Sequence, residues 1–160
     1  MASWRRPHPQ SVPTQVKLSG LYPGCVLAKQ DAEESGFDDA LLLDHRGFIA
    51  EATGANIFVV MAAELHAPIA DCFLNGITRQ VVMDIAIANG LQVIERHIAP
   101  DEIATASEAF LTGTAAEITP VREIAGTELT CNHVCRLIAA EYARRARSGE
   151  WPTGLLRIGR

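Results

Sequence analysis

Apolar and polar positions alternate along the chain with two different periods. Residues 22–35 place apolar side chains at helical spacing, with Leu27 and Ala28 directed inward, and Gly36 ends the pattern. The outward positions of this segment are charged: Lys29, Asp31, Glu33 and Glu34. Short apolar runs follow at residues 40–43 and 48–51, on either side of a polar turn, and at residues 56–60. The pattern predicts a helix, then a β-hairpin, then a further strand.

The second half of the chain also alternates between helical and extended segments. Residues 78–89 predict a helix that ends at Gly90, residues 91–95 an extended segment, and Pro100 the start of a short helix. A buried strand is expected at residues 109–112 and an amphipathic helix at residues 134–147. The inward positions of the helix at 78–89 are expected to be Val81, Val82, Ile85 and Ala86. Short strands between helices, with a hairpin among them, predict an α/β domain built on a mixed sheet.

Residues 1–14 contain Pro7, Pro9 and Pro13, so we expect an extended segment there. The chain has 160 residues, of which 48% are hydrophobic and 21% charged, which fits a single globular core. Its formal charge of -5 argues against a nucleic-acid surface, and the basic clusters at residues 5–6 and 144–147 are expected to be solvated. No apolar run approaches the roughly 20 residues of a membrane span, and the start lacks the apolar core of a secretory signal, so we predict a cytoplasmic protein without a membrane partner.

The four cysteines are sparsely distributed, which predicts reduced thiols rather than a disulfide framework. Cys131, His133 and Cys135 are candidate metal ligands, but no second cluster completes a zinc site. We therefore expect buried free thiols and no metal.

Several residues are candidates for chemistry. Lys17 lies between Pro13 and Gly20, in locally irregular backbone, where a partly buried amine is suited to Schiff-base formation; the alternative is an ordinary exposed lysine. Glu51 enters a turn that ends at Asn56, so a carboxylate there is able to keep a heterocyclic nitrogen protonated. The alternative for Glu51 is a solvated turn residue.

Two further turns favour anions. The segment GITR at residues 76–79 begins a helix, where free N–H groups and the Thr78 hydroxyl favour a phosphate, although Thr78 is equally suited to a plain N-cap. The segment TGTAAE at residues 112–117 offers a second set of backbone donors, or else a tight strand-to-loop turn. Together these turns, a lysine and an acid predict a cofactor site.

These segments resemble the class IV aminotransferases in order and spacing. The segments that match are KLSGLY at 17–22, EATGANIF at 51–58, GITR at 76–79 and GTAAEITPV at 113–121. The likeness is greatest to the branched-chain amino-acid aminotransferases, the fold-type IV pyridoxal 5′-phosphate enzymes, and it runs from about Ser3 to Glu123. The resemblance implies a mixed-sheet pseudo-barrel large domain, with residues 1–16 as its extended N-terminal segment and residues 17–160 as its cofactor-binding part.

The resemblance also implies roles for single residues. Lys17 would link covalently to pyridoxal 5′-phosphate and move the proton between the substrate α-carbon and the cofactor C4′. Tyr22 would bond the phenolic oxygen, and Glu51 would pair with the pyridine nitrogen. The remaining roles would be support of the ring by Asn56, phosphate binding by Ile77, Thr78 and Thr114, and substrate carboxylate binding by Ala115 and Ala116.

The implied reaction is transamination of branched-chain amino acids with 2-oxoglutarate, as in branched-chain amino acid biosynthesis, by a homodimer. The family's small N-terminal domain, which supplies a phosphate-binding arginine and much of the substrate pocket, is expected to be absent, so the chain looks truncated and inactive alone. The alternatives are a non-catalytic remnant, or a D-amino-acid transaminase or aminodeoxychorismate lyase on the same scaffold.

Overall fold

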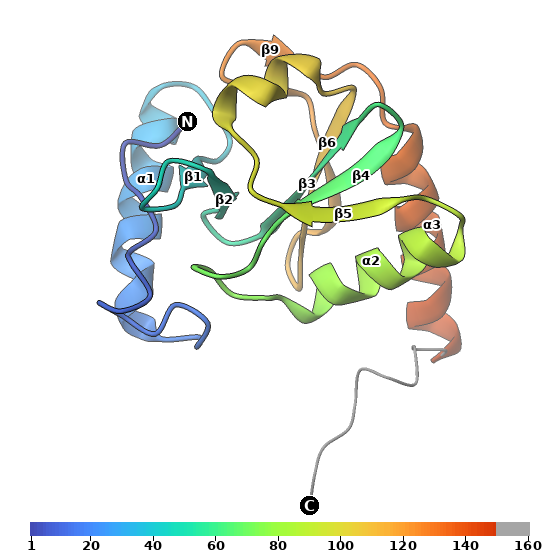
Figure 1. Cartoon of the computed structure of the whole chain (residues 1–160), viewed down its shortest axis with the longest axis horizontal. Coiled ribbons are helices and arrows are strands. Elements are labelled where there is room, and N and C mark those ends of the chain that lie inside the picture. The colour runs from blue at the N-terminus through green and yellow to red at the C-terminus, as the bar shows by residue number, and fades with distance from the viewer. Residues whose placement is uncertain (150–160) are drawn as a thin grey trace, which may run out of the picture.

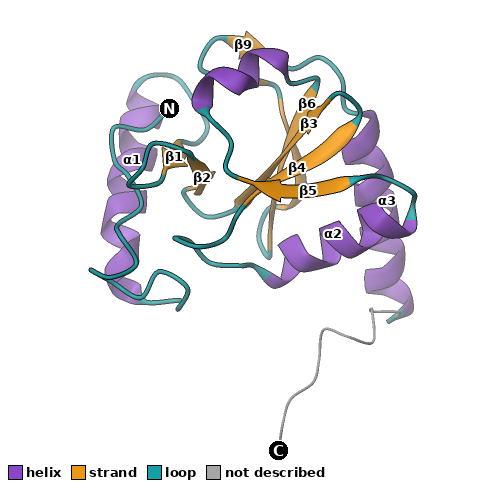
Figure 2. Cartoon of the chain, viewed as in Figure 1, coloured by secondary structure: helices purple, strands orange, loops and turns teal. Residues whose placement is uncertain are grey.

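The computed structural model describes residues 1–149, so residues 150–160 of the expected cofactor-binding part lie outside the described residues. Figure 1 shows a central sheet with helices beside it, and Figure 2 separates the helices from the strands. The helical elements are η1 Ser19–Leu21, α1 Tyr22–Glu34, α2 Ile77–Ala88, η2 Pro100–Thr105 and α3 His133–Ser148. The strands are β1 Leu41–Leu43, β2 Ile49–Ala52, β3 Asn56–Met61, β4 Glu64–Pro68, β5 Val93–Arg96, β6 Glu108–Gly113, β7 Glu117–Val121, β8 Glu123–Ile124 and β9 Thr127–Glu128.

The main sheet has seven strands in the order β1-β2-β3-β4-β5, and β6 pairs with both β3 and β7. The pair β4–β5 is parallel and is connected through α2, whereas the other pairs are antiparallel. The predicted mixed sheet is therefore confirmed. Strands β8 and β9 form a separate two-stranded ribbon.

Successive residues of β3 point to opposite faces of the sheet and feed two different cores. On one face, Phe58 stacks on Phe110 with the ring centroids 5.4 Å apart, and α2 and α3 cover them. On the other face, Ile57 and Val59 pack with Ile103 of η2. Full burial of each such side chain stabilises the fold by about 1.5 to 3 kcal/mol.

The predicted helices and the hairpin are confirmed within one or two residues. The helix α1 ends at Glu34 with Ser35 as its C-cap, and the next residue, Gly36, has a φ of 86°. One expectation for α1 is wrong, because Leu27 is 40% exposed. The buried face of this helix consists of Cys25 and Ala28, which pack with Ala40 and Leu42. In α2, the inward positions expected from the sequence are all buried.

The N-terminal segment contains no helix before Ser19 and runs beside β1, where Arg5 bridges Leu43. Arg6 is only 6% exposed, so the expected solvation of the first basic cluster is wrong for this residue. All four cysteines are free, but only Cys25, Cys72 and Cys135 are buried, whereas Cys131 is exposed. Within residues 1–149, no helix is both long and apolar enough to cross a lipid bilayer.

Candidate active site

Glu51 and Asn56 face each other at the closed end of the β2–β3 hairpin. The two residues are paired in the antiparallel register, and the Asn56 Nδ2 donates a hydrogen bond of 3.2 Å to the Glu51 Oε2. Cross-strand partners share one face of a sheet, so both side chains point to the side of the sheet that α1 and α2 cover. The turn therefore presents a carboxylate and an amide together, as the sequence predicts.

Asn56 also connects this turn to the start of α2. Its Nδ2 donates to the Leu74 carbonyl at 3.0 Å, and its Oδ1 accepts the Gly76 N–H at 3.3 Å. A Cβ on Gly76 would lie 2.5 Å from the same Oδ1, so only glycine permits this close approach. The distance between the carboxylate and the helix start is thus fixed by one buried amide side chain.

The first turn of α2 has backbone N–H groups without an intrahelical acceptor, and no side chain caps them. Thr78 is buried to 9% exposure in this turn, while the Ile77 side chain is 75% exposed. Free N–H groups at the positive end of a helix are a favourable site for a phosphate group.

Arg79 fixes the position of this helix start. Its guanidinium donates to the Pro68 carbonyl at 2.8 Å, the Asn75 Oδ1 at 2.9 Å and the Glu95 Oε2 at 2.6 Å. The side chain is 1% exposed, so the loop before α2 is wrapped around a buried charge.

The end of β6 lies next to the hairpin, because β6 pairs with β3 along the edge opposite to β2. Thr112 pairs with Asn56, and a Cβ on Gly113 would lie 3.5 Å from the Gly54 carbonyl and 3.7 Å from Ala55. The turn that follows contains Thr114, Ala115 and Ala116, of which Thr114 and Ala115 are exposed. The three segments that the sequence singled out after Lys17 therefore converge on one end of the hairpin.

Lys17 lies on the segment that leads into α1 and Tyr22 is the first residue of that helix, and both are exposed. No hydrogen bond or ion pair links either residue to Glu51 among residues 1–149. The Lys17 side chain is therefore exposed, the alternative to a partly buried amine that the sequence left open.

An unexpected connection runs from α1 to Glu51 through Arg6. The Arg6 Nη1 donates to the Cys25 Sγ at 3.4 Å, and the Arg6 Nε lies 3.3 Å from the Glu51 Oε1. That Nε–H does not point along a hydrogen-bond direction, so the contact with Glu51 is an ion pair only. Burial raises the pKa of Glu51 to about 7, and the Arg6 charge opposes this rise. Sequence analysis missed Arg6 because its partner lies on a strand far along the chain.

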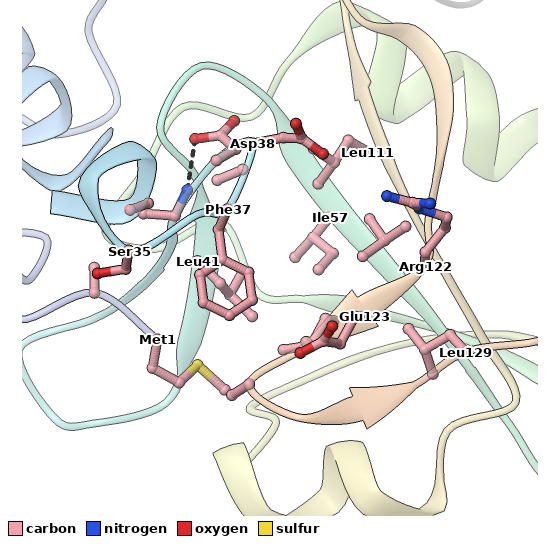
Figure 3. Close-up of a pocket in the computed structure, with 18 of the residues that line it drawn as sticks. Met1, Ser35, Phe37, Asp38, Leu41, Ile57, Leu111, Arg122, Glu123 and Leu129 are labelled. Atoms are coloured by element: carbon pink, nitrogen blue, oxygen red, sulfur yellow. Dashed lines mark hydrogen bonds between the residues drawn. The ribbon is translucent and has the colours of Figure 1, made fainter. Parts of the chain in front are cut away.

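A groove of about 1010 Å³ lies elsewhere on the molecule (Figure 3). Ala52, Ile57 and Leu111 line it, and the first two directly follow Glu51 and Asn56, so the groove opens on the opposite face of the sheet. The groove lining includes none of the residues expected at the site, namely Lys17, Tyr22, Glu51, Asn56, Ile77, Thr78, Thr114, Ala115 and Ala116.

Two overlapping clusters among the described residues have the composition of a metal site. Asp44, His45 and Cys72 form one, and Asp44, Asp71 and His97 form the other, each with ligand atoms within 4.8 Å of one another. However, the Arg46 guanidinium donates to Asp44 at 2.8 Å and to both oxygens of Asp71 at 2.9 and 2.8 Å. The arginine supplies the positive charge that these carboxylates need, and the network holds the β1–β2 turn against the loop before α2.

Known proteins match this chain over a region that includes these segments. The family model for amino-transferase class IV matches residues 1–124. The branched-chain-amino-acid aminotransferase of Pseudomonas aeruginosa is 40% identical over 128 residues, which cover 80% of this chain and 42% of that protein.

Solved structures show the same fold. The branched-chain aminotransferase from Thermoproteus uzoniensis with norvaline superposes with a TM-score of 0.89 at 38% identity, over 94% of this chain and 51% of that one. A second branched-chain amino acid aminotransferase, from T.th. and complexed with N-(5′-phosphopyridoxyl)-L-glutamate, gives a TM-score of 0.88 at 36% identity, over 94% and 52%. The chain spans about half the length of these relatives.

Proposed function

The chain belongs to the class IV aminotransferases, and we propose that it is the cofactor-binding part of a pyridoxal 5′-phosphate-dependent transaminase of branched-chain amino acids. The observation that carries this proposal is the convergence of Glu51, Asn56 and the uncapped start of α2 on one end of the hairpin. The relatives that the chain matches are branched-chain aminotransferases, and one of them is complexed with a phosphopyridoxyl glutamate. The glutamate in that complex supports 2-oxoglutarate as the amino acceptor.

The described residues fit such a cofactor. The uncapped N–H groups of α2 suit the phosphate, and Asn56 holds this helix start beside Glu51. Glu51 is 12% exposed and lies beside the Arg6 cation, which favours the charged form of a carboxyl group in this desolvated position. When bound, pyridoxal 5′-phosphate supplies an electron sink for the electrons released at the substrate α-carbon.

Each residue then has a defined task. The Lys17 Nζ would hold the cofactor and move the proton between the substrate α-carbon and C4′, and the Tyr22 hydroxyl would bond the phenolic oxygen. Glu51 would accept a hydrogen bond from the pyridine N–H while Asn56 holds that carboxylate in place. The phosphate would be bound by Ile77, Thr78 and Thr114, and the substrate carboxylate by Ala115 and Ala116. The proposed assembly is a homodimer in the cytoplasm.

A borohydride-trapping experiment tests this proposal directly. The purified chain is mixed with pyridoxal 5′-phosphate, reduced with borohydride and digested, and the labelled lysine is identified by mass spectrometry. We expect the label on Lys17, loss of the label in Lys17→Ala, and no loss in Lys29→Ala, since Lys29 lies on the exposed face of α1. Equal labelling of both lysines, or none, contradicts the proposal and favours a non-catalytic remnant.

Substrate class is tested separately, with the chain alone and with a family small domain added in trans. Leucine, isoleucine and valine are expected to transfer their amino groups to 2-oxoglutarate, which is followed as glutamate formation. Transfer from D-alanine instead, or release of pyruvate from aminodeoxychorismate, assigns the chain to one of the other two branches.

A further inference from the structure

Arg6 is held by contacts of both its backbone and its side chain. Its backbone N–H donates to the Leu43 carbonyl at 2.8 Å, beside the isolated bridge between Arg5 and Leu43, so this segment lies along β1. The Arg6 side chain then passes inward between α1 and the hairpin, where it is 6% exposed. A buried guanidinium requires a partner, and Glu51 is the carboxylate it meets.

The surroundings of Glu51 contain little else that affects its charge. Cys25 of α1 contacts the other side of the guanidinium, and burial raises the pKa of this thiol, so it stays neutral near pH 7. Asp39 acts on the same thiol, and Asn56 contributes a neutral amide. Arg6 is thus the charge that decides whether the Glu51 carboxyl, in its desolvated position, is ionised.

We propose that Arg6 is a positioning residue that favours the ionised form of the Glu51 carboxyl and directs it at the ring nitrogen of the cofactor. The inference rests on the proposed function, because it assigns Glu51 to that nitrogen. Arg6 itself touches neither cofactor nor substrate; it acts through Glu51. A carboxylate that is neutral at the working pH would not hold a positive charge on the ring, so removal of Arg6 weakens the electron sink even if the fold is intact.

The first test uses the chain without cofactor. The Glu51 carboxyl is followed by carbon NMR in protein labelled with ¹³C at the glutamate side-chain carboxyl, and Glu51→Gln assigns the signal. We expect Arg6→Gln to raise the titration midpoint of Glu51 by about one pH unit or more, because the variant removes an opposite charge at this distance. A rise of one pH unit corresponds to a tenfold higher proton affinity. Arg6→Lys keeps a positive charge but lacks the Nε contact, so we expect its titration midpoint to lie between those of the unaltered chain and Arg6→Gln. Arg5→Gln is the matched control, because Arg5 is exposed and lies next in sequence.

Equal midpoints in Arg6→Gln and Arg5→Gln overturn the inference. If Arg6→Gln does not fold, as circular dichroism will show, Arg6→Lys decides alone, and an unmoved midpoint there overturns it too. If Arg6 had a purely structural role, the two Arg6 variants would change the stability of the chain but would leave the titration of the Glu51 carboxyl in the folded chain unchanged.

The second test adds pyridoxal 5′-phosphate labelled with ¹⁵N in the ring, whose nitrogen shift reports protonation. We expect a protonated ring nitrogen with the unaltered chain and with Arg6→Lys, and a shift toward the neutral ring with Arg6→Gln. If the unaltered chain binds no cofactor, the proposed function fails, while the carbon titration still judges the pairing of Arg6 with Glu51. If the cofactor binds and its nitrogen shift is the same in all variants, the inference alone fails.

Discussion

The Asn56 side-chain oxygen accepts the Gly76 N–H at 3.3 Å, and a Cβ on Gly76 would stand 2.5 Å from that oxygen. The backbone of Gly76 has a φ of -62°, which any residue adopts, so the glycine is needed for space rather than for conformation. The contact joins the carboxylate end of the hairpin to the proposed phosphate end of α2.

Gly76→Ala is therefore expected to destabilise the chain by about 1 to 3 kcal/mol, measured by urea unfolding. The added methyl group forces Asn56 to give up hydrogen bonds with Glu51 or with the Leu74 carbonyl. Gly24→Ala is the matched control, since nothing lies within 4 Å of its Cβ position in α1, and we expect no loss there. A Gly76→Ala variant as stable as Gly24→Ala would show that Asn56 moves freely.

Glu51 makes the stability of the cofactor-free chain depend on pH. Its pKa rises from an ordinary 4.5 to about 7 on burial, so the folded chain binds this proton more tightly than the unfolded chain does. The free energy of unfolding is therefore expected to fall as the pH rises from about 4.5 to about 7, by up to about 3 kcal/mol from this group. Urea unfolding between about pH 5 and pH 8 measures the slope.

Glu51→Gln isolates this effect, because glutamine cannot ionise. The variant is expected to lack the loss of stability in that pH range and to be more stable than the unaltered chain above it. Glu117→Gln, at an exposed position of β7, is expected to keep the slope of the unaltered chain. Parallel slopes for the unaltered chain and Glu51→Gln would mean that Glu51 is ionised throughout.

Local patterns were sufficient to predict the elements that bear the site. The alternating apolar runs around residues 44–47 give the hairpin, and the stop at Gly90 gives α2, because both depend on neighbouring residues alone. The order of the segments then allowed the family to be recognised, and the match of the family model over residues 1–124 confirms it.

Contacts between distant segments could not be predicted in this way. Arg6 is next to another arginine and looks solvated, yet it is buried against Glu51, which lies on a strand contributed much later. Strand β4 was missed because Glu64 and His66 interrupt its apolar pattern, although His66 is buried in the sheet. Whether Lys17 is buried or exposed was left open for the same reason, since the burial of a side chain depends on distant parts of the molecule.

Arg79 provides a test of how the start of α2 is held. Arg79→Met removes hydrogen bonds to the Pro68 carbonyl, Asn75 and Glu95, and leaves the buried carbonyl without a partner. We expect a loss of about 2 to 4 kcal/mol in urea unfolding, together with weaker binding of pyridoxal 5′-phosphate by the folded variant. Arg136→Met, at an exposed position of α3, is the control, and equal losses in the two variants would contradict the prediction.

Glu108 joins β6 to the start of α3 in a similar manner. Its carboxylate is 2% exposed and accepts hydrogen bonds from the Val134 N–H at 3.0 Å, the Cys135 N–H at 3.1 Å and the Cys131 thiol at 3.2 Å. Glu108→Gln turns an NH₂ group toward these donors, so a loss of about 1.5 to 3 kcal/mol is expected, with faster exchange of the Val134 and Cys135 amide protons. Hydrogen exchange followed by NMR measures the protection of these two amide protons and the stability loss that accompanies it. Glu128→Gln, at an exposed position of β9, is the control. Equal protection in the two variants would show that α3 is held by its apolar face alone.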